Sequence, residues 1–314
     1  MKKLIVLLLA LAMVGAVSAQ VTTAIGLYGE VTFINQAGNA VFTDYGAGWD
    51  TLTFKGSDKD GKYGFSATYN NVLDTATVFG GVRDWNVWAK GKFTKVFLGK
   101  LRNADFRMTL PYWAGATVFG GTDRITGYGV LVETLPMNGF TFGVNLPIGT
   151  TADKLVNVLQ KTDVGLKYDV KGFGTLIALA NLDLVTPSNV VNVGFKYTGM
   201  KNLTAVVIGQ AKFDANTYKA GLGFAYSGID KLAANLEAAV TSTAGTLAYS
   251  VWAQGKYSVT DQVSATVGGS YADTGYDAYA AVGYDYGNGL SSEAKVGFNG
   301  AVYGALTLYY GVSF

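Results

Sequence analysis

Apolar and polar residues alternate with a period of two in segment after segment from residue 21 onward. In 163–170, for example, apolar residues at 164, 166, 168 and 170 alternate with Asp163, Gly165, Lys167 and Asp169. A period of two places successive side chains on opposite faces of a β-strand. Because the segments run about ten residues, the length at which a tilted strand crosses a bilayer, the pattern predicts an all-β protein, a transmembrane antiparallel β-barrel with lipid outside and water inside.

Eighteen strands are predicted, and sixteen are the alternative, because two adjacent hairpins could merge or lie outside the barrel. Tight turns such as 58–61 and 287–289 alternate with longer segments such as 103–125, which predicts short periplasmic turns and longer extracellular loops. Both termini are expected on the short-turn side, so the strand number should be even. The predicted strands are 21–33, 47–57, 62–73, 83–93, 95–102, 126–135, 139–147, 162–170, 173–184, 190–198, 202–213, 217–227, 231–241, 246–257, 262–272, 276–286, 290–299 and 302–314.

The first nineteen residues have the pattern of a cleaved secretory signal. Lys2 and Lys3 precede a continuous apolar run over 4–17, which is too short for a spanning helix, and small residues at 17–19 offer a cleavage site after Ala19. We therefore predict a signal peptide over 1–19, a single barrel domain over 20–314, and a location in the outer membrane of a diderm bacterium.

Composition excludes several classes of function. Without Lys2 and Lys3 the 24 basic residues become 22, equal to the 22 acidic residues, so the basic surface that nucleic acid requires is missing. The chain has no Cys and no His, which removes disulfides and the commonest general base and metal ligand. We expect no enzymatic activity, no catalytic residues, no cofactor and no metal.

The last strand ends in a hydrophobic stripe that includes Tyr310, Val312 and Phe314. In a closed barrel this strand must pair with the first one, because an unsatisfied sheet edge is not tolerated in lipid. The stripe is therefore predicted to face lipid. A C-terminal aromatic residue on such a strand also resembles the signal that the barrel-assembly machinery reads.

Several stretches resemble the general bacterial porins, the trimeric diffusion channels of Gram-negative outer membranes. They are "GLYGEV" at 26–31, "LTFKG" at 52–56, "RDWNVWAKGKFTKVFLGK" at 83–100 and the last strand. The resemblance implies a homotrimer in outer-membrane lipid, a water-filled channel for ions and small hydrophilic solutes, and a third loop, 103–125, folded into the pore. This loop keeps Pro111 and "FGGTD" but lacks the Glu that the family usually has there, so the usual cation preference does not follow.

Charged residues on the polar phase are the candidates for the pore lining. In the first five strands they are Glu30, Lys55, Lys90, Lys92, Lys100 and Arg102. By resemblance, Lys55 and Lys100 match the family's basic cluster best, and the loop's Asp105 and Asp123 would face them, beside Arg107 and Arg124. The alternative for any single residue is an ordinary solvated position away from the narrowest point.

Aromatic residues are predicted mainly as interfacial girdles near the strand ends. A second interpretation concerns the rings on the polar phase, namely Tyr28, Trp88, Trp252, Tyr279 and Tyr309, which could form a track that stacks sugar rings. Three functions therefore stay open: a passive porin, a channel selective for a sugar or another solute, and, less favoured, a structural anchor or adhesin.

Overall fold

The structure is a computed structural model that describes residues 20–34, 49–70, 81–113, 118–148, 160–185 and 188–313. At positions 20, 25, 27–34, 49, 50, 312 and 313 it describes the backbone alone. The predicted signal peptide, Phe314 and the loops over 35–48, 71–80 and 149–159 lie outside the described residues. Within the described part of the chain, no helix is long and apolar enough to cross a membrane.

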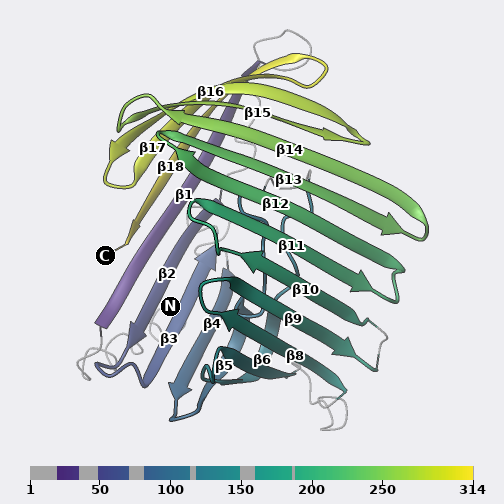
Figure 1. The fold of residues 1–314 in the computed structure, drawn as a ribbon. Helices are drawn as coiled ribbons and strands as arrows, with labels where there is room; N and C mark the ends of the chain where they lie inside the picture. The colour runs from purple at the N-terminus through teal and green to yellow at the C-terminus, as the bar shows by residue number, and fades with distance from the viewer. Residues whose placement is uncertain are drawn as a thin grey trace.

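Eighteen antiparallel strands form one sheet that closes on itself (Figure 1), which confirms the predicted number. Each strand pairs with the next, and β1 pairs with β18 from Ala24 opposite Ser313 to Ile34 opposite Gly304. The strands are β1 Gln20–Ile34, β2 Trp49–Ser57, β3 Tyr63–Asn70, β4 Gly81–Lys90, β5 Thr94–Asn103, β6 Ile125–Thr134, β7 Phe140–Pro147, β8 Lys161–Val170, β9 Gly174–Asp183, β10 Val190–Tyr197, β11 Leu203–Lys212, β12 Thr217–Ile229, β13 Leu232–Thr243, β14 Thr246–Ser258, β15 Val263–Ala272, β16 Gly275–Gly287, β17 Leu290–Phe298 and β18 Val302–Ser313.

Two rows of side chains follow from the strand register. One row is apolar and exposed, as at Val193, Val207, Val267 and Val282, which are 51–64% accessible. From β6 to β18 this row contains no Asp, Glu, Lys or Arg among the described side chains. An apolar exposed band is what lipid contact requires, so we call this the outward row and the other the inward row.

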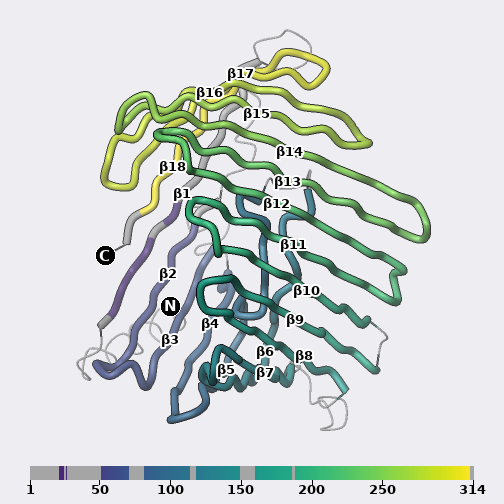
Figure 2. The backbone as a smooth tube through the Cα atoms, viewed as in Figure 1, coloured from purple at the N-terminus to yellow at the C-terminus, as the bar shows by residue number. Residues whose placement is uncertain are grey.

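The inward row is identified by the segment 104–124, which lies inside the barrel. Its residues Met108, Leu110 and Val118 belong to one buried apolar cluster with Ile177 of β9 and with Val206 and Ile208 of β11. The tube in Figure 2 shows this segment crossing behind the strands β10–β13. The third loop therefore lies in the lumen, as the resemblance implied.

The far end of the β5–β6 hairpin bends into the barrel. β5 pairs with β4 only as far as Lys100, and β6 pairs with β7 only from Gly129. The two strands nevertheless stay paired with each other to the level of Asn103 and Ile125. Asn103 donates a hydrogen bond of 3.0 Å to Glu133, although a straight β6 would place Glu133 about 26 Å from Ile125. The hairpin end must fold back over the inward row.

Apolar packing stabilises this bend. Phe97, Leu101, Ile125 and Leu131 of the hairpin are each at most 8% exposed and form one cluster with Phe106 of the loop. Gly127, opposite Leu101, has a φ of 100°, a conformation that favours glycine and turns β6 at this point. The bend delivers the following loop to the lumen rather than to the outside.

Candidate functional site: the loop inside the barrel

The loop 104–124 is a small hairpin of its own. The amide of Leu110 donates to the carbonyl of Gly120 at 2.9 Å, and the amide of Thr122 donates to the carbonyl of Met108 at 2.9 Å. Its four tip residues, 114–117, lie outside the described residues. These bonds satisfy backbone groups that are shielded from water, so the loop is an ordered element.

Glycines of the inward row make room for the loop. A side chain at Gly143 or Gly165 would overlap the ring of Phe106, and one at Gly223 would press on Pro111. Phe106 itself is 1% exposed. Residues on the polar phase of the alternation thus build a second apolar core between loop and wall, and the lumen is narrowed on this side.

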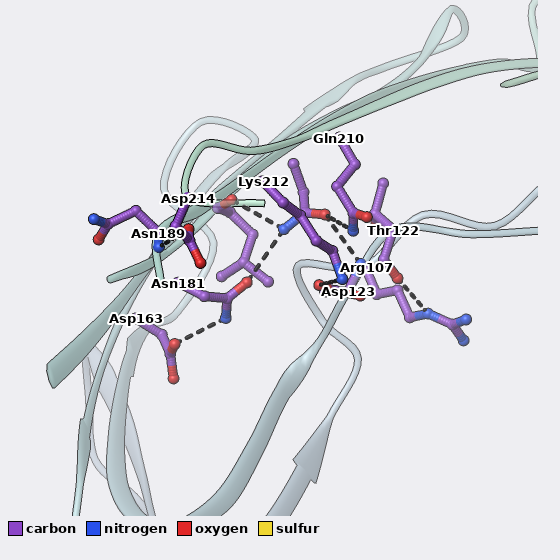
Figure 3. A network of polar contacts seen from close by, with 11 residues as sticks. Arg107, Thr122, Asp123, Asp163, Asn181, Asn189, Gln210, Lys212 and Asp214 are labelled. Carbon is purple, nitrogen blue, oxygen red and sulfur yellow. Dashed lines mark hydrogen bonds and ion pairs between the residues drawn. The ribbon is translucent and has the colours of Figure 1, made fainter. Parts of the chain in front are cut away.

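A ladder of amide side chains binds the loop near its C-terminal end (Figure 3). Asn181 donates to Asp163 at 2.8 Å, Asn192 donates to Asn181 at 3.2 Å, and Gln210 donates to Asn192 at 2.9 Å. The backbone amide of Asp123 then donates to the same Asn192 oxygen at 3.1 Å. Since buried amides are stable only when paired, the ladder links four neighbouring strands to the end of the loop.

A carboxylate holds the loop at Tyr112 and Trp113. Glu237 of β13 is fully buried and accepts two hydrogen bonds on one oxygen, from the backbone amides of Tyr112 at 2.7 Å and Trp113 at 2.9 Å. The ring of Tyr112 stacks on Trp252 of β14, with centroids 4.4 Å apart and planes inclined by 14°. Bonds from backbone amides to a carboxylate are among the stronger hydrogen bonds in proteins, so Tyr112 and Trp113 are firmly placed.

Arginines gather at the two ends of the loop. The pKa of Arg124 is lowered to about 10, first by burial and then by the charges of Arg107, Arg102 and Arg83. Burial and the charge of Arg102 also lower the pKa of Arg107. In the described part of the chain neither Arg107 nor Arg124 makes an ion pair, whereas Arg83 is paired with Asp84 at 2.6 Å. Positive charge that is outside any described ion pair therefore lines this side of the lumen.

A polar cavity of about 550 Å³ lies between the loop and the wall. It is lined by Arg107, Thr122, Asp123, Arg124, Asp163 and Asn181, together with groups of β6, β10 and the segment before β10. Lys212 approaches Asp123 to 3.6 Å. The described residues contain no group of three or more metal-ligating side chains. A cavity with this polar lining can admit small polar or anionic solutes from the water of the lumen.

The structure brings together only part of the predicted charge cluster. Lys55 lies on the inward row of β2, opposite Ser66. Lys100 instead shares the row of Leu98, opposite Tyr128, and its ammonium group donates to the carbonyl of Val82 at 2.8 Å. Lys55 and Lys100 therefore do not share one face of the wall as the predicted basic cluster requires, because Lys100 is on the outward row.

The remaining predicted residues are scattered. Lys90 ends β4, and Lys92 lies in the β4–β5 turn with its ammonium group 5.0 Å from the ring of Phe93. Asp105 accepts a hydrogen bond from Asn103 at 2.8 Å. Arg102 sits in the bent hairpin end, where its charge acts on Arg107 and Arg124.

The structure describes the side chains of some of the predicted aromatic residues and only the backbone of Tyr28. Trp88 and Trp252 are on the inward row, but Trp252 is only 6% exposed because Tyr112 covers it. Tyr279 accepts a hydrogen bond from Gln254 at 3.1 Å. The backbone pairs Tyr28 with Tyr309 and Glu30 with Thr307, but the side chains of Tyr28, Glu30 and Val312 lie outside the described ones.

Sequence reasoning did not single out Glu237, Asn192, Tyr112 or Trp113. Glu237 is one of only 22 acidic residues, and it falls on the inward phase of β13 in an otherwise uncharged strand. A single charge on the inward phase of an uncharged strand was the sequence feature that could have identified Glu237. Its partner could not be found from the pattern, because the loop that it binds is over a hundred residues earlier in the chain.

No protein-family model matches the chain, and no curated protein matches it. Solved structures do match, at low identity. OpdQ of Pseudomonas aeruginosa has a TM-score of 0.57 at 11% identity, over 94% of this chain and 97% of that one. OccK11 (OpdR) of the same organism has 0.56 at 10%, over 94% and 96%, and a triple mutant of the Rhodopseudomonas blastica porin has 0.55 at 11%, over 94% and 100%. The chain thus has the fold of bacterial porin barrels.

Proposed function

We propose that the protein is an outer-membrane porin, a water-filled channel through which ions and small hydrophilic solutes diffuse passively. The observation that carries this proposal is the loop inside a closed eighteen-stranded barrel, which has an uncharged outward row from β6 to β18 and arginines at the lumen. A barrel of this strand number leaves an aqueous channel. The loop is fixed by Glu237 and the amide ladder, so the narrowing is permanent.

The arginines favour anions. Arg107 and Arg124 are half-buried and without an ion pair in the described part of the chain, and charged groups at a constriction set ion preference. We expect stepwise conductance in planar bilayers and a reversal potential in a KCl gradient that reports preference for chloride. Arg107→Gln combined with Arg124→Gln should reduce this preference, and Lys92→Gln, in a turn outside the lumen, is the matched control. A silent bilayer at saturating protein would favour the anchor function instead.

A selective channel is the second candidate, and the cavity of about 550 Å³ beside the arginines favours it. Liposome swelling with sugars of graded size distinguishes the two functions. Rates that fall smoothly with size indicate a general sieve, whereas one solute that enters faster than its size allows indicates selectivity.

The homotrimer is part of the proposal. The inward bend leaves residues 81–84 of β4 without β5 beside them, apart from the bond from Lys100 to Val82. Open strand edges are not tolerated in lipid, and a second copy of the chain would cover this one. Size-exclusion chromatography with light scattering in detergent tests it, and a monomer mass would contradict it.

Export and assembly complete the proposal. Cleavage after Ala19 would make Gln20 the first residue of the mature chain, which mass spectrometry of the purified protein checks. If Phe314 is read by the assembly machinery, its deletion should lower the amount of folded barrel in the outer membrane, while a change at Phe93 in a periplasmic turn should not.

A further inference from the structure

Two neighbouring aromatic rings of the loop stay open to the lumen. Tyr112 is 50% exposed and Trp113 is 47% exposed, whereas Leu110, two residues earlier, is 1% exposed. One face of the Tyr112 ring packs on the wall at Trp252, so its exposed face points away from the wall. Large apolar side chains that are left open in a group often mark a binding site.

The two rings are held in place. Tyr112 is stacked on Trp252, and the backbone amides of both residues are bonded to Glu237. Trp113 has a φ of 56°, which a bulky residue rarely adopts. A side chain at Gly120 would overlap the indole of Trp113, so glycine leaves room for the ring. Strain of this kind persists only where the surroundings enforce it, and it concentrates at functional sites.

A positive charge lies directly beside the rings. The guanidinium carbon of Arg107 is 4.4 Å from the centroid of the Trp113 ring, and its Nε donates to the carbonyl of Thr122 at 2.8 Å. Its other N–H groups make no ion pair within the described residues. A planar guanidinium on an aromatic face is a suitable partner for a carboxylate.

We propose that Tyr112, Trp113 and Arg107 form a binding subsite for small solutes that combine a flat unsaturated ring with an anionic group. This subsite rests on the proposed channel function and deepens it. The ring of the solute stacks on an exposed aromatic face, and its anionic group pairs with Arg107. An aromatic stack contributes beyond the area that it buries, so such solutes stay longer in the channel than anions of the same size without a ring.

Block of the single-channel current by benzoate in KCl tests the subsite. Benzoate should interrupt the current at lower concentration than acetate, which lacks the ring, and than benzyl alcohol, which lacks the charge. Trp113→Leu and Tyr112→Leu should each raise the half-blocking benzoate concentration roughly 3- to 10-fold, and Trp113→Phe should retain most of the affinity. Tyr63→Leu, which removes an exposed tyrosine of the outward row, is the matched control.

Conductance in KCl alone shows that each variant is folded and open. Equal block of wild type and both leucine variants, or block by acetate as strong as by benzoate, would overturn the subsite and leave the channel standing. A glucose block that Trp113→Leu abolishes, without a benzoate block, would overturn the anionic class of solute. Absence of any conductance in the wild type would overturn the channel and the subsite together.

Discussion

The inward row differs between two parts of the barrel. On the loop-covered wall, the inward row of β7–β14, apolar residues and glycines pack under the loop beside the polar anchors Asn192 and Glu237, and Ile177, Val206 and Ile208 are at most 2% exposed. On the open wall, the inward row of β2 and β15–β18, the same phase carries Lys55, Glu293 and Lys295. The residue types of the inward row therefore follow what the row faces. The open wall faces water, and the loop-covered wall faces protein.

This difference explains how a barrel of modest charge content still has a polarised lumen. The loop-covered wall contributes its apolar side chains to a core and presents the loop's arginines to the water. The open wall contributes its own charges directly. A substitution under the loop should therefore lower the stability and, as a consequence, alter permeation. A substitution on the open wall should alter permeation alone.

The largest expected effect is at the centre of the covered core. Phe106→Ala removes a ring that is 1% exposed and packs over two glycines. We expect a loss of about 3–5 kcal/mol in the free energy of unfolding, measured by urea unfolding in lipid vesicles, and a wider, noisier conductance. Phe93→Ala, at a ring that is 60% exposed, is the control and should change neither quantity appreciably. Equal losses in both variants would show that the loop does not form a core.

A smaller effect is expected at the carboxylate that holds the loop at Tyr112 and Trp113. Glu237→Ala leaves the backbone amides of Tyr112 and Trp113 without their acceptor, which should cost about 1–3 kcal/mol and increase current noise. Glu237→Gln keeps an acceptor but loses the charge, so its effect should be intermediate. Glu293→Gln on the open wall should leave the noise unchanged. If it raised the noise as much as the change at Glu237, the two walls would not differ in the way described.

The smallest expected effect is on the reversal potential, and it compares one lysine of the inward row with one of the outward row. Lys55→Gln, on the inward row, should shift the reversal potential in a salt gradient slightly toward cations. Lys100→Gln, on the outward row, should leave it unchanged because its ammonium group is bonded to Val82 at the wall. An equal shift in both variants would mean that Lys100 reaches the lumen.

Much of the fold could be predicted from alternation alone. Strand β10 was predicted at 190–198 and is Val190–Tyr197, and β8 was predicted at 162–170 and is Lys161–Val170. Alternation arises because the two faces of each strand meet different solvents, so it identifies the strands and their rows well. It could not show that the end of the β5–β6 hairpin leaves the wall, since the apolar packing of Leu101 and Ile125 on Phe106 depends on tertiary structure.

The candidate site was harder to predict for the same reason. The role of Arg107 and Arg124 became clear only when the bend placed them with Arg102. Arg102 has the same phase as Lys100 in β5, so alternation alone could not distinguish their roles. Trp252 has the inward phase that sequence suggested, yet Tyr112 covers it. Contacts between a loop and a wall leave no periodic signal in either segment.

The bond between Tyr112 and Glu237 joins residues 125 positions apart, and this distance imposes an order on barrel biogenesis. Contacts of such long range form late and slow folding, because a large loop of chain must be closed first. The third loop can dock only after β13 has formed, so the narrowed lumen is completed late in assembly. A chain that formed β13 but failed to dock the loop would have a barrel with a wider, unconstricted channel.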